Sequence, residues 1–140
     1  MSTDYAGDLS PLAAWDCLAK DTKAELIDVR SEAEWRHVGL PNLSDLSKEV
    51  HLISWQFFPD MRQNLDFVEE MEAKSFDKNQ CLLFLCRSGV RSKYAAQVMT
   101  SLGYTKCFNV AEGFEGDRDQ NGHRGTVGGW KKADLPWSQA

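Results

Sequence analysis

Residues 81–96 read Cys-Leu-Leu-Phe-Leu-Cys-Arg-Ser-Gly-Val-Arg-Ser-Lys-Tyr-Ala-Ala, and this stretch decides the fold. The unbroken apolar run Leu82–Leu85 is typical of a parallel strand that is covered on both faces. From Val90 onward, apolar residues recur at helical spacing as far as Leu102, and a glycine then ends the helix. Cys86 therefore falls where a strand ends and a helix begins, which is the edge where open α/β sheets bind ligands.

The rest of the chain alternates between strand and helix patterns in the same way. Ser10 and Pro11 suit the N-cap and the first position of a helix, and Ser31 suits the N-cap of a second, short helix. Repeated alternation predicts an α/β fold with a mostly parallel five-stranded sheet and helices on both faces. The expected strands are residues 5–9, 24–29, 50–57, 82–85 and 107–110; a helix is expected over residues 65–76 and a short one from residue 130.

The length of 140 residues predicts a single domain, residues 1–140, with its core over about residues 8–137. A net charge of −5 argues against a nucleic-acid-binding protein, which would be basic. No segment is long and apolar enough to cross a bilayer, and the N-terminal residues 1–8 lack the features of a secretory signal, so we expect a cytoplasmic protein. A glycine-rich surface loop at about residues 111–129 is either functional or a variable insertion.

The residues around Cys86 predict a reactive thiol. The start of a helix offers unpaired backbone N–H groups and a partial positive charge, and Arg87 and Arg91 add two full positive charges. These effects favour a thiolate over a thiol, and Gly89 lets the backbone approach a bound group closely. The simpler alternative is a buried, inert cysteine at the end of a core strand. Two arginines and a glycine in the next five positions favour the reactive thiol.

The other three cysteines lack these surroundings. Cys17 lies on a predicted helix, and Cys81 and Cys107 lie at the beginnings of predicted strands. No Cys-x-x-Cys pair is present, so the sequence predicts neither a metal site nor a redox pair, and no cofactor is expected. We interpret all three as packing residues, with a resolving role for one of them as the alternative.

Several motifs in order along the chain resemble the rhodanese family of sulfurtransferases. The loop from Cys86 to Ser92 is similar to the family's active-site loop, and Asp28-Val29-Arg30 followed by Glu34-Trp35 resembles its Asp-x-Arg motif and Glu-aromatic pair. Leu40-Pro41 and the ending from Trp130 to Pro136 also match. The chain departs from the family at Val38-Gly39 and Asn42-Leu43, where Gly-His and Gly-Ala are usual, and in its longer glycine-rich loop.

The resemblance implies double displacement through a persulfide. Cys86 would attack the outer sulfur of a small anionic donor such as thiosulfate, and cyanide or a thiol, including a thiol on a protein, would then accept that sulfur. Arg87 is expected to meet the donor, whereas Arg91 either binds substrate or pairs with Asp28 or Glu34. Arg30 would brace the loop, and Ser88 and Ser92 would contact sulfur or cap the helix. The predicted active-site loop comprises Cys86, Arg87, Ser88, Gly89, Val90, Arg91 and Ser92, supported by Asp28, Arg30 and Glu34.

Two other functions use the same fold. One is a phosphatase or an arsenate reductase: cysteine phosphatases place an arginine six positions after the cysteine, where this chain has Ser92, and Arg91 comes one position early. The shorter loop gives a narrower cradle, which fits a sulfur atom better than a tetrahedral phosphate. A non-catalytic module that binds or regulates a partner is the other alternative, although such modules often lack the cysteine.

Overall fold

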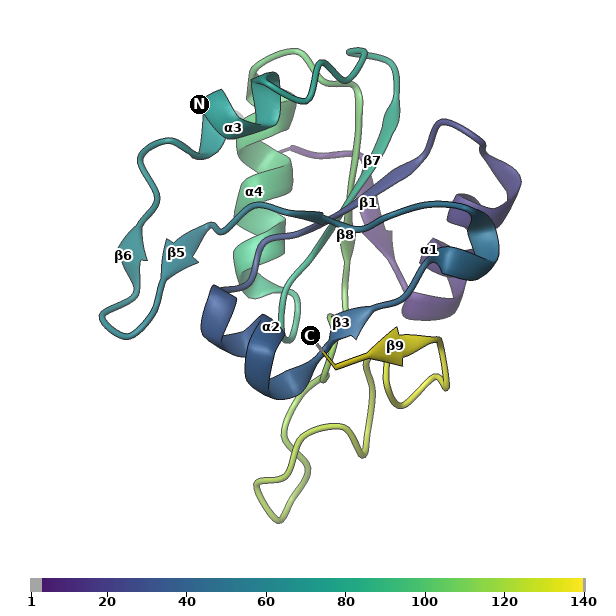
Figure 1. The fold of residues 1–140 in the computed structure, drawn as a ribbon, viewed down its shortest axis with the longest axis vertical. Coiled ribbons are helices and arrows are strands. Elements are labelled where there is room, and N and C mark those ends of the chain that lie inside the picture. Colours follow the sequence, from purple (N-terminus) through teal and green to yellow (C-terminus); the bar gives the residue numbers. More distant parts are fainter. Residues whose placement is uncertain (1–3, 140) are drawn as a thin grey trace.

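The computed structural model describes residues 4–139, so the expectation about residues 1–8 rests partly on positions outside the described residues. Its centre is a five-stranded sheet in which every neighbouring pair of strands is parallel (Figure 1). This confirms the predicted α/β class. In sheet order the strands are β1 (Gly7–Leu9), β8 (Lys106–Val110), β7 (Cys81–Leu85), β2 (Glu25–Asp28) and β4 (His51–Leu52).

The central strand β7 is buried along its whole length because helices cover both faces of the sheet. Leu82, Phe84 and Cys86 belong to the core that packs under α3 (Phe67–Glu72) and α4 (Val90–Ser101). The alternate residues Leu83 and Leu85 belong to the core under α1 (Pro11–Lys20). The two-residue period of a strand therefore decides that Cys86 lies on the α4 side of the sheet.

The N-termini of the first two helices form as the sequence predicts. The side chain of Ser10 accepts a hydrogen bond from the Ala13 amide at the start of α1, with Pro11 at the first helical position. Helix α2 (Glu32–Val38) begins with a capping box between Ser31 and Glu34. Two amides that the helix itself leaves unpaired are satisfied in this way, which fixes where α2 begins beside the end of β2.

Two small antiparallel sheets flank the central one. β3 (Leu40–Pro41) pairs with β9 (Trp137–Ser138), and β5 (Gln56–Phe57) pairs with β6 (Arg62–Gln63). Residues 130–137, where we expected a short helix and a packing tail, form turns that lead into β9, with Trp130 and Leu135 buried. The helix part of that prediction was wrong, because residues 130–134 form turns and the chain then pairs with β3. A 3-10 helix covers Ser44–Leu46.

The expected strand at residues 50–57 is broken into two. The chain follows β2 only through β4 and the hydrogen bonds from Ile53 to Asp28 and from Trp55 to Val29. The side-chain amide of Asn64 then donates to the carbonyl of Ser54 (2.8 Å), and its backbone N–H donates to the carbonyl of Trp55 (3.0 Å). These bonds turn the chain into the β5–β6 hairpin, so the β-rich composition of the segment did not specify one continuous strand.

The helix expected over residues 65–76 is shorter, since α3 covers only Phe67–Glu72. Leu65, which the periodicity places on the buried face, is 90% exposed and precedes the helix. Ser75 adopts a left-handed backbone (φ 59°), which ends the helical path before Phe76. Among the described residues, none of the helices is long and apolar enough to cross a membrane.

Candidate active site

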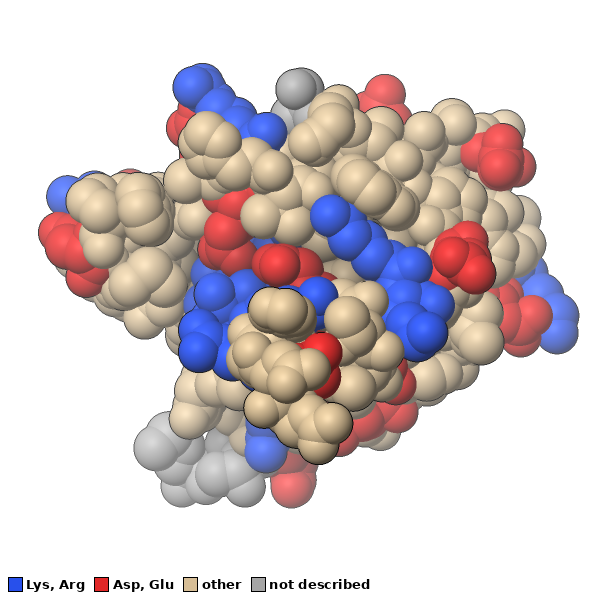
Figure 2. All heavy atoms as spheres, turned by 90° about the horizontal axis from the view of Figure 1, so that it is seen from below, with Lys and Arg blue, Asp and Glu red and all other residues tan. Residues whose placement is uncertain are grey.

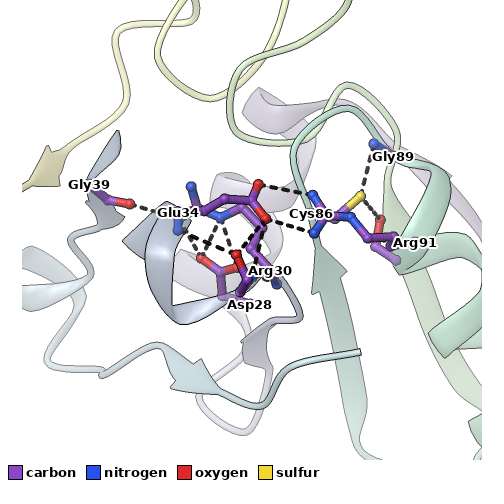
Figure 3. A network of polar contacts seen from close by, with 9 residues as sticks. Asp28, Arg30, Glu34, Gly39, Cys86, Gly89 and Arg91 are labelled. Atoms are coloured by element: carbon purple, nitrogen blue, oxygen red, sulfur yellow. Dashed lines mark hydrogen bonds and ion pairs between the residues drawn. The ribbon is translucent and has the colours of Figure 1, made fainter. Parts of the chain in front are cut away.

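Cys86 lies directly after β7, in the loop that precedes α4, and is 1% exposed. Its sulfur accepts a hydrogen bond from the backbone amide of Gly89 at 3.1 Å, and the hydroxyl of Ser92 lies 3.2 Å away (Figure 3). Ser88 is half-buried on the same loop. Val90 begins α4 with a side chain that is largely exposed, so it offers the site its backbone rather than its side chain.

Gly89 is the N-cap of α4, and its conformation explains how the loop closes around the sulfur. Its φ of 106° lies in the region that favours glycine, and a Cβ there would collide with the carbonyl oxygen of Ala111. A glycine is therefore required to turn the amide toward Cys86 while the chain enters the helix. The sulfur lies at the positive end of the helix dipole.

Asn109, which our sequence analysis did not identify, holds the hydroxyl of Ser92. Its amide nitrogen donates to the Asp8 carboxylate and to the carbonyl of Gly89, both at 3.1 Å. Those partners only accept hydrogen bonds, so the amide oxygen of Asn109 faces Ser92 and accepts its hydroxyl hydrogen at 2.5 Å. A hydroxyl has one hydrogen, so Ser92 can accept the thiol hydrogen of Cys86, or turn and donate to its thiolate. The one feature of the sequence that could have identified Asn109 is that it is a polar residue inside a predicted buried strand.

Asp28 and Arg30 form a fully buried ion pair beneath the site (Figure 3). The guanidinium of Arg30 donates to both carboxylate oxygens, at 2.9 Å and 2.7 Å, and also to the carbonyl of Gly39 at 2.8 Å. Arg30 stacks over the ring of Phe114 (4.3 Å), and the Phe114 amide donates to the carbonyl of Cys86. The ion pair therefore supports the predicted active-site loop indirectly, because Arg30 contacts Phe114 and Phe114 is hydrogen-bonded to Cys86.

Arg91 pairs with Glu34, one of the two acids that the sequence offered as its partner. Two parallel hydrogen bonds of 2.7 Å and 2.9 Å join the guanidinium to the carboxylate. Burial alone would raise the pKa of Glu34, but the hydrogen bonds and charge of Arg91 outweigh it and lower that pKa below its usual value. Burial acts to lower the pKa of Arg91, but Glu34 and, less strongly, Cys86 raise it. The ion pair between Arg91 and Glu34 thus joins α4 to α2.

Glu34→Gln is expected to lower the free energy of unfolding by about 1–2 kcal/mol at neutral pH, because a partly buried, bidentate ion pair is lost. A carboxylate with a lowered folded-state pKa stabilises above its unfolded-state pKa, and that contribution disappears as the pH falls through the folded-state pKa. The difference between the variant and the wild type should therefore shrink below about pH 4. Urea unfolding of both proteins from pH 3 to 7 measures this difference in the free energy of unfolding. Glu32→Gln, which breaks the exposed Glu32–Arg36 pair on the same helix, is the matched control.

Arg87 is an exposed cation of the predicted active-site loop. Its side chain is exposed, and within residues 4–139 it makes no side-chain hydrogen bond or ion pair. It lines a pocket of about 340 Å³ together with Glu34, Arg91 and two apolar side chains, Phe58 and Met61. Phe58 and Met61 come from the turn of the β5–β6 hairpin. The sequence did not connect this hairpin with the site, because the position of the hairpin depends on the break in the strand expected at residues 50–57.

The other cysteines lie in different surroundings. The sulfur of Cys81 lies 3.5 Å from that of Cys17, and burial together with this contact raises the pKa of Cys81 to about 12. Burial raises the pKa of Cys107 to about 11. Both groups therefore remain thiols at neutral pH. In the part of the chain that is described, no three His, Cys, Asp or Glu side chains are grouped so as to hold a metal ion.

Comparisons with known proteins agree with this architecture. The family model described as the STR4 middle domain matches residues 7–140. The crystal structure of Rv0390 from M. tuberculosis is 45% identical, with a TM-score of 0.89 over 98% of this chain and 100% of that one. An uncharacterized protein of Rickettsia conorii is 39% identical over 89% of this chain and 90% of its own length.

A plant relative carries the family name. The rice protein called THYLAKOID RHODANESE-LIKE, chloroplastic, is 27% identical over 94% of this chain, which spans 25% of that longer protein. The resemblance seen in the sequence motifs thus agrees with the fold and with the matched family model. We conclude that the chain belongs to the rhodanese-like family, within the group described by the STR4 middle domain.

Proposed function

We propose that the protein is a sulfurtransferase that carries sulfane sulfur as a persulfide on Cys86. The thiolate of Cys86 attacks the outer sulfur of a donor such as thiosulfate, the S–S bond of the donor breaks, and sulfite leaves with the bonding electron pair. A thiol or cyanide then attacks the outer sulfur of the persulfide and regenerates the Cys86 thiolate.

One observation carries this proposal: the sulfur of Cys86 is held at the N-terminus of α4, with the Gly89 amide at 3.1 Å and the Ser92 hydroxyl at 3.2 Å. The Gly89 amide is a fixed donor that favours negative charge on the sulfur, and the Ser92 hydroxyl adds a second donor when it turns from Asn109 to the thiolate. Cys86 is the cysteine with these surroundings, since Cys81 and Cys107 have raised pKa values. A protein thiol remains a candidate acceptor, and a cytoplasmic location remains a prediction from the sequence.

The burial of Cys86 favours sulfur transfer over phosphate chemistry. With 1% of the residue exposed, the approach to its sulfur is narrow, and a terminal sulfur atom reaches it more easily than a tetrahedral phosphate or arsenate. Arg91, the arginine nearest to the phosphatase position, is occupied by Glu34. A non-catalytic binding module would have no need of hydrogen bonds that converge on the sulfur, so that alternative ranks second.

Intact-mass analysis after incubation with thiosulfate tests the proposal. We expect one added sulfur atom, located on Cys86 by peptide mapping and removed again by cyanide. Cys17, Cys81 and Cys107 should gain none, because their surroundings do not stabilise a persulfide anion. If Cys86 gains no sulfur from thiosulfate or from an organic persulfide, the result contradicts the sulfurtransferase and favours the function of a non-catalytic binding module.

A further inference from the structure

Ser92 has a single hydroxyl hydrogen, and two acceptors compete for it. The hydroxyl oxygen lies 3.2 Å from the sulfur of Cys86 and 2.5 Å from the amide oxygen of Asn109. Ser92 and Asn109 are both buried, with 0% and 3% of the residue exposed. A hydroxyl that donates to Asn109 turns a lone pair toward the sulfur, whereas one that donates to the sulfur stabilises a thiolate. The direction of this one hydrogen therefore affects the ionisation of Cys86.

The side chain of Asn109 is held so that its oxygen faces Ser92. Its amide nitrogen donates to the Asp8 carboxylate and to the carbonyl of Gly89, both at 3.1 Å. A flip of the amide would turn its oxygen toward these two acceptors, which is unfavourable. The backbone around Asn109 is fixed as well, because β8 pairs with β1 on one side and β7 on the other. The amide oxygen therefore loses its hydrogen bond whenever the Ser92 hydroxyl turns to the sulfur.

The glycine-rich loop holds the backbone at the sulfur in place. The Phe114 amide donates to the carbonyl of Cys86 at 2.8 Å, and the amides of Glu115 and Gly116 donate to the carbonyl of Arg87 at 2.9 Å and 3.1 Å. Because the backbone at the sulfur and the side chain of Asn109 are both fixed, the movable part is the serine hydroxyl, which needs only to rotate about its C–O bond.

Charged side chains of both signs lie around the site, and they come from four elements. They are Arg87 and Arg91 in the active-site loop and α4, Glu34 on α2, Asp28 and Arg30 at the end of β2, and Asp8 on β1. Figure 2 shows the face that carries α2 and the glycine-rich loop, where Lys and Arg lie beside Asp and Glu. Hydrogen bonding to Asp8 raises the pKa of Tyr5 to about 12, and burial raises that of Cys107 to about 11. Uncharged substitutions at Ser92 or Asn109 leave every one of these groups in place.

We propose that Asn109 is a positioning residue that draws the hydroxyl hydrogen of Ser92 away from Cys86 and so shifts the balance at Cys86 from thiolate toward thiol. On ionisation the thiol proton leaves to solvent, the hydroxyl turns to the sulfur, and Asn109 gives up its hydrogen bond. As a statement about the reaction, this rests on the proposed function. A thiolate becomes less nucleophilic as its thiol becomes more acidic, so Asn109 exchanges a smaller thiolate fraction for a more reactive thiolate.

Asn109→Leu tests this, because leucine has a similar shape and no acceptor for the Ser92 hydroxyl. The ultraviolet absorbance of the Cys86 thiolate is followed against pH, and the curve of the same protein with Cys86→Ser is subtracted. The midpoint should fall by about 0.5–1.5 pH units, which is about three- to thirtyfold more thiolate below it, because Ser92 then donates freely to the sulfur. The acid limb of kcat/KM for thiosulfate should move in the same direction, so the variant should outpace the wild type at acid pH.

Ser92→Ala supplies the matched background, because it removes the hydrogen for which the two acceptors compete. In that background Asn109→Leu should move the midpoint by less than about 0.3 pH units. An equal fall in both backgrounds would show that Asn109 acts through the shape of the loop and would overturn the proposal. An unchanged or higher midpoint in the single variant would overturn it too.

Asn109→Ser replaces the leucine variant if that protein does not fold. The serine hydroxyl ends one bond short of the amide oxygen of Asn109, so it leaves the Ser92 hydroxyl free, and the same fall of the midpoint is expected. The titration needs no sulfur donor. If Cys86 takes sulfur from no donor, the proposed function fails, and the midpoints in the two backgrounds still decide on the role of Asn109.

Discussion

Cys86→Ser is expected to lower the rate of sulfur transfer from thiosulfate to cyanide by more than about a thousandfold, because the chemistry passes through a covalent bond to this sulfur. A serine hydroxyl in the same place accepts the Gly89 amide and contacts Ser92, but it is not ionised at neutral pH. The fold should therefore persist, with a change of less than about 1 kcal/mol in the free energy of unfolding. Steady-state kinetics and thermal unfolding on the same preparation measure both effects.

Cys17→Ser is the matched control for that experiment. It removes one sulfur by the same substitution, from a half-buried position on α1 where its contact is the Cys81 thiol. Its rate of sulfur transfer should stay within about twofold of the wild type, because α1 supplies nothing to the active-site loop. Substantial transfer by the Cys86 variant would refute the persulfide mechanism, and comparable losses in both variants would point to instability.

Asp28→Ala is expected to lower the free energy of unfolding by about 3–5 kcal/mol, because it leaves the buried charge of Arg30 without its partner. Both side chains of this pair are 0% exposed, so water cannot replace the lost hydrogen bonds. A domain is stable by only about 5–15 kcal/mol in total, so the variant should unfold at much lower urea concentration. Urea denaturation followed by tryptophan fluorescence measures the effect, with Asp16→Ala, which breaks an exposed pair with Lys20, as the control.

The double variant Asp28→Leu/Arg30→Met keeps this prediction testable if the single variant does not fold. Replacing both partners removes the unpaired charge and leaves apolar groups in a buried site, so most of the lost stability should return. Sulfur transfer should still be impaired, because Arg30 positions Phe114, whose amide holds the carbonyl of Cys86. Equal stabilities for Asp28→Ala and Asp16→Ala would show that the buried pair contributes no more than a surface pair.

The order of the main helices and strands could be predicted from the sequence because a local signal specifies each of them. The apolar run of β7, the Ser10–Pro11 start of α1 and the capping residues of α2 all act over a few positions of sequence. The position of the loop Cys86–Ser92 between β7 and α4 could also be predicted, since neighbouring residues define a strand-to-helix junction; the catalytic role of the loop stays a prediction. Where the local signal was composition alone, as at residues 50–57 and 130–137, the prediction failed because contacts with Asn64 and β3 decided the backbone.

The sequence by itself therefore determined the fold class, the cysteine at the end of the central strand, and the glycine that lets an amide point at its sulfur. Only the tertiary structure decided the division between the two arginines: Arg91 is held by Glu34, which is distant in the chain, whereas Arg87 stays exposed. It also brought Asn109 to Ser92, the glycine-rich loop to the backbone of Arg87, and the β5–β6 hairpin to the pocket that Arg87 lines. The reason is physical, since charge pairing and pocket walls depend on which distant segments pack together, and no local pattern of residues specifies that packing.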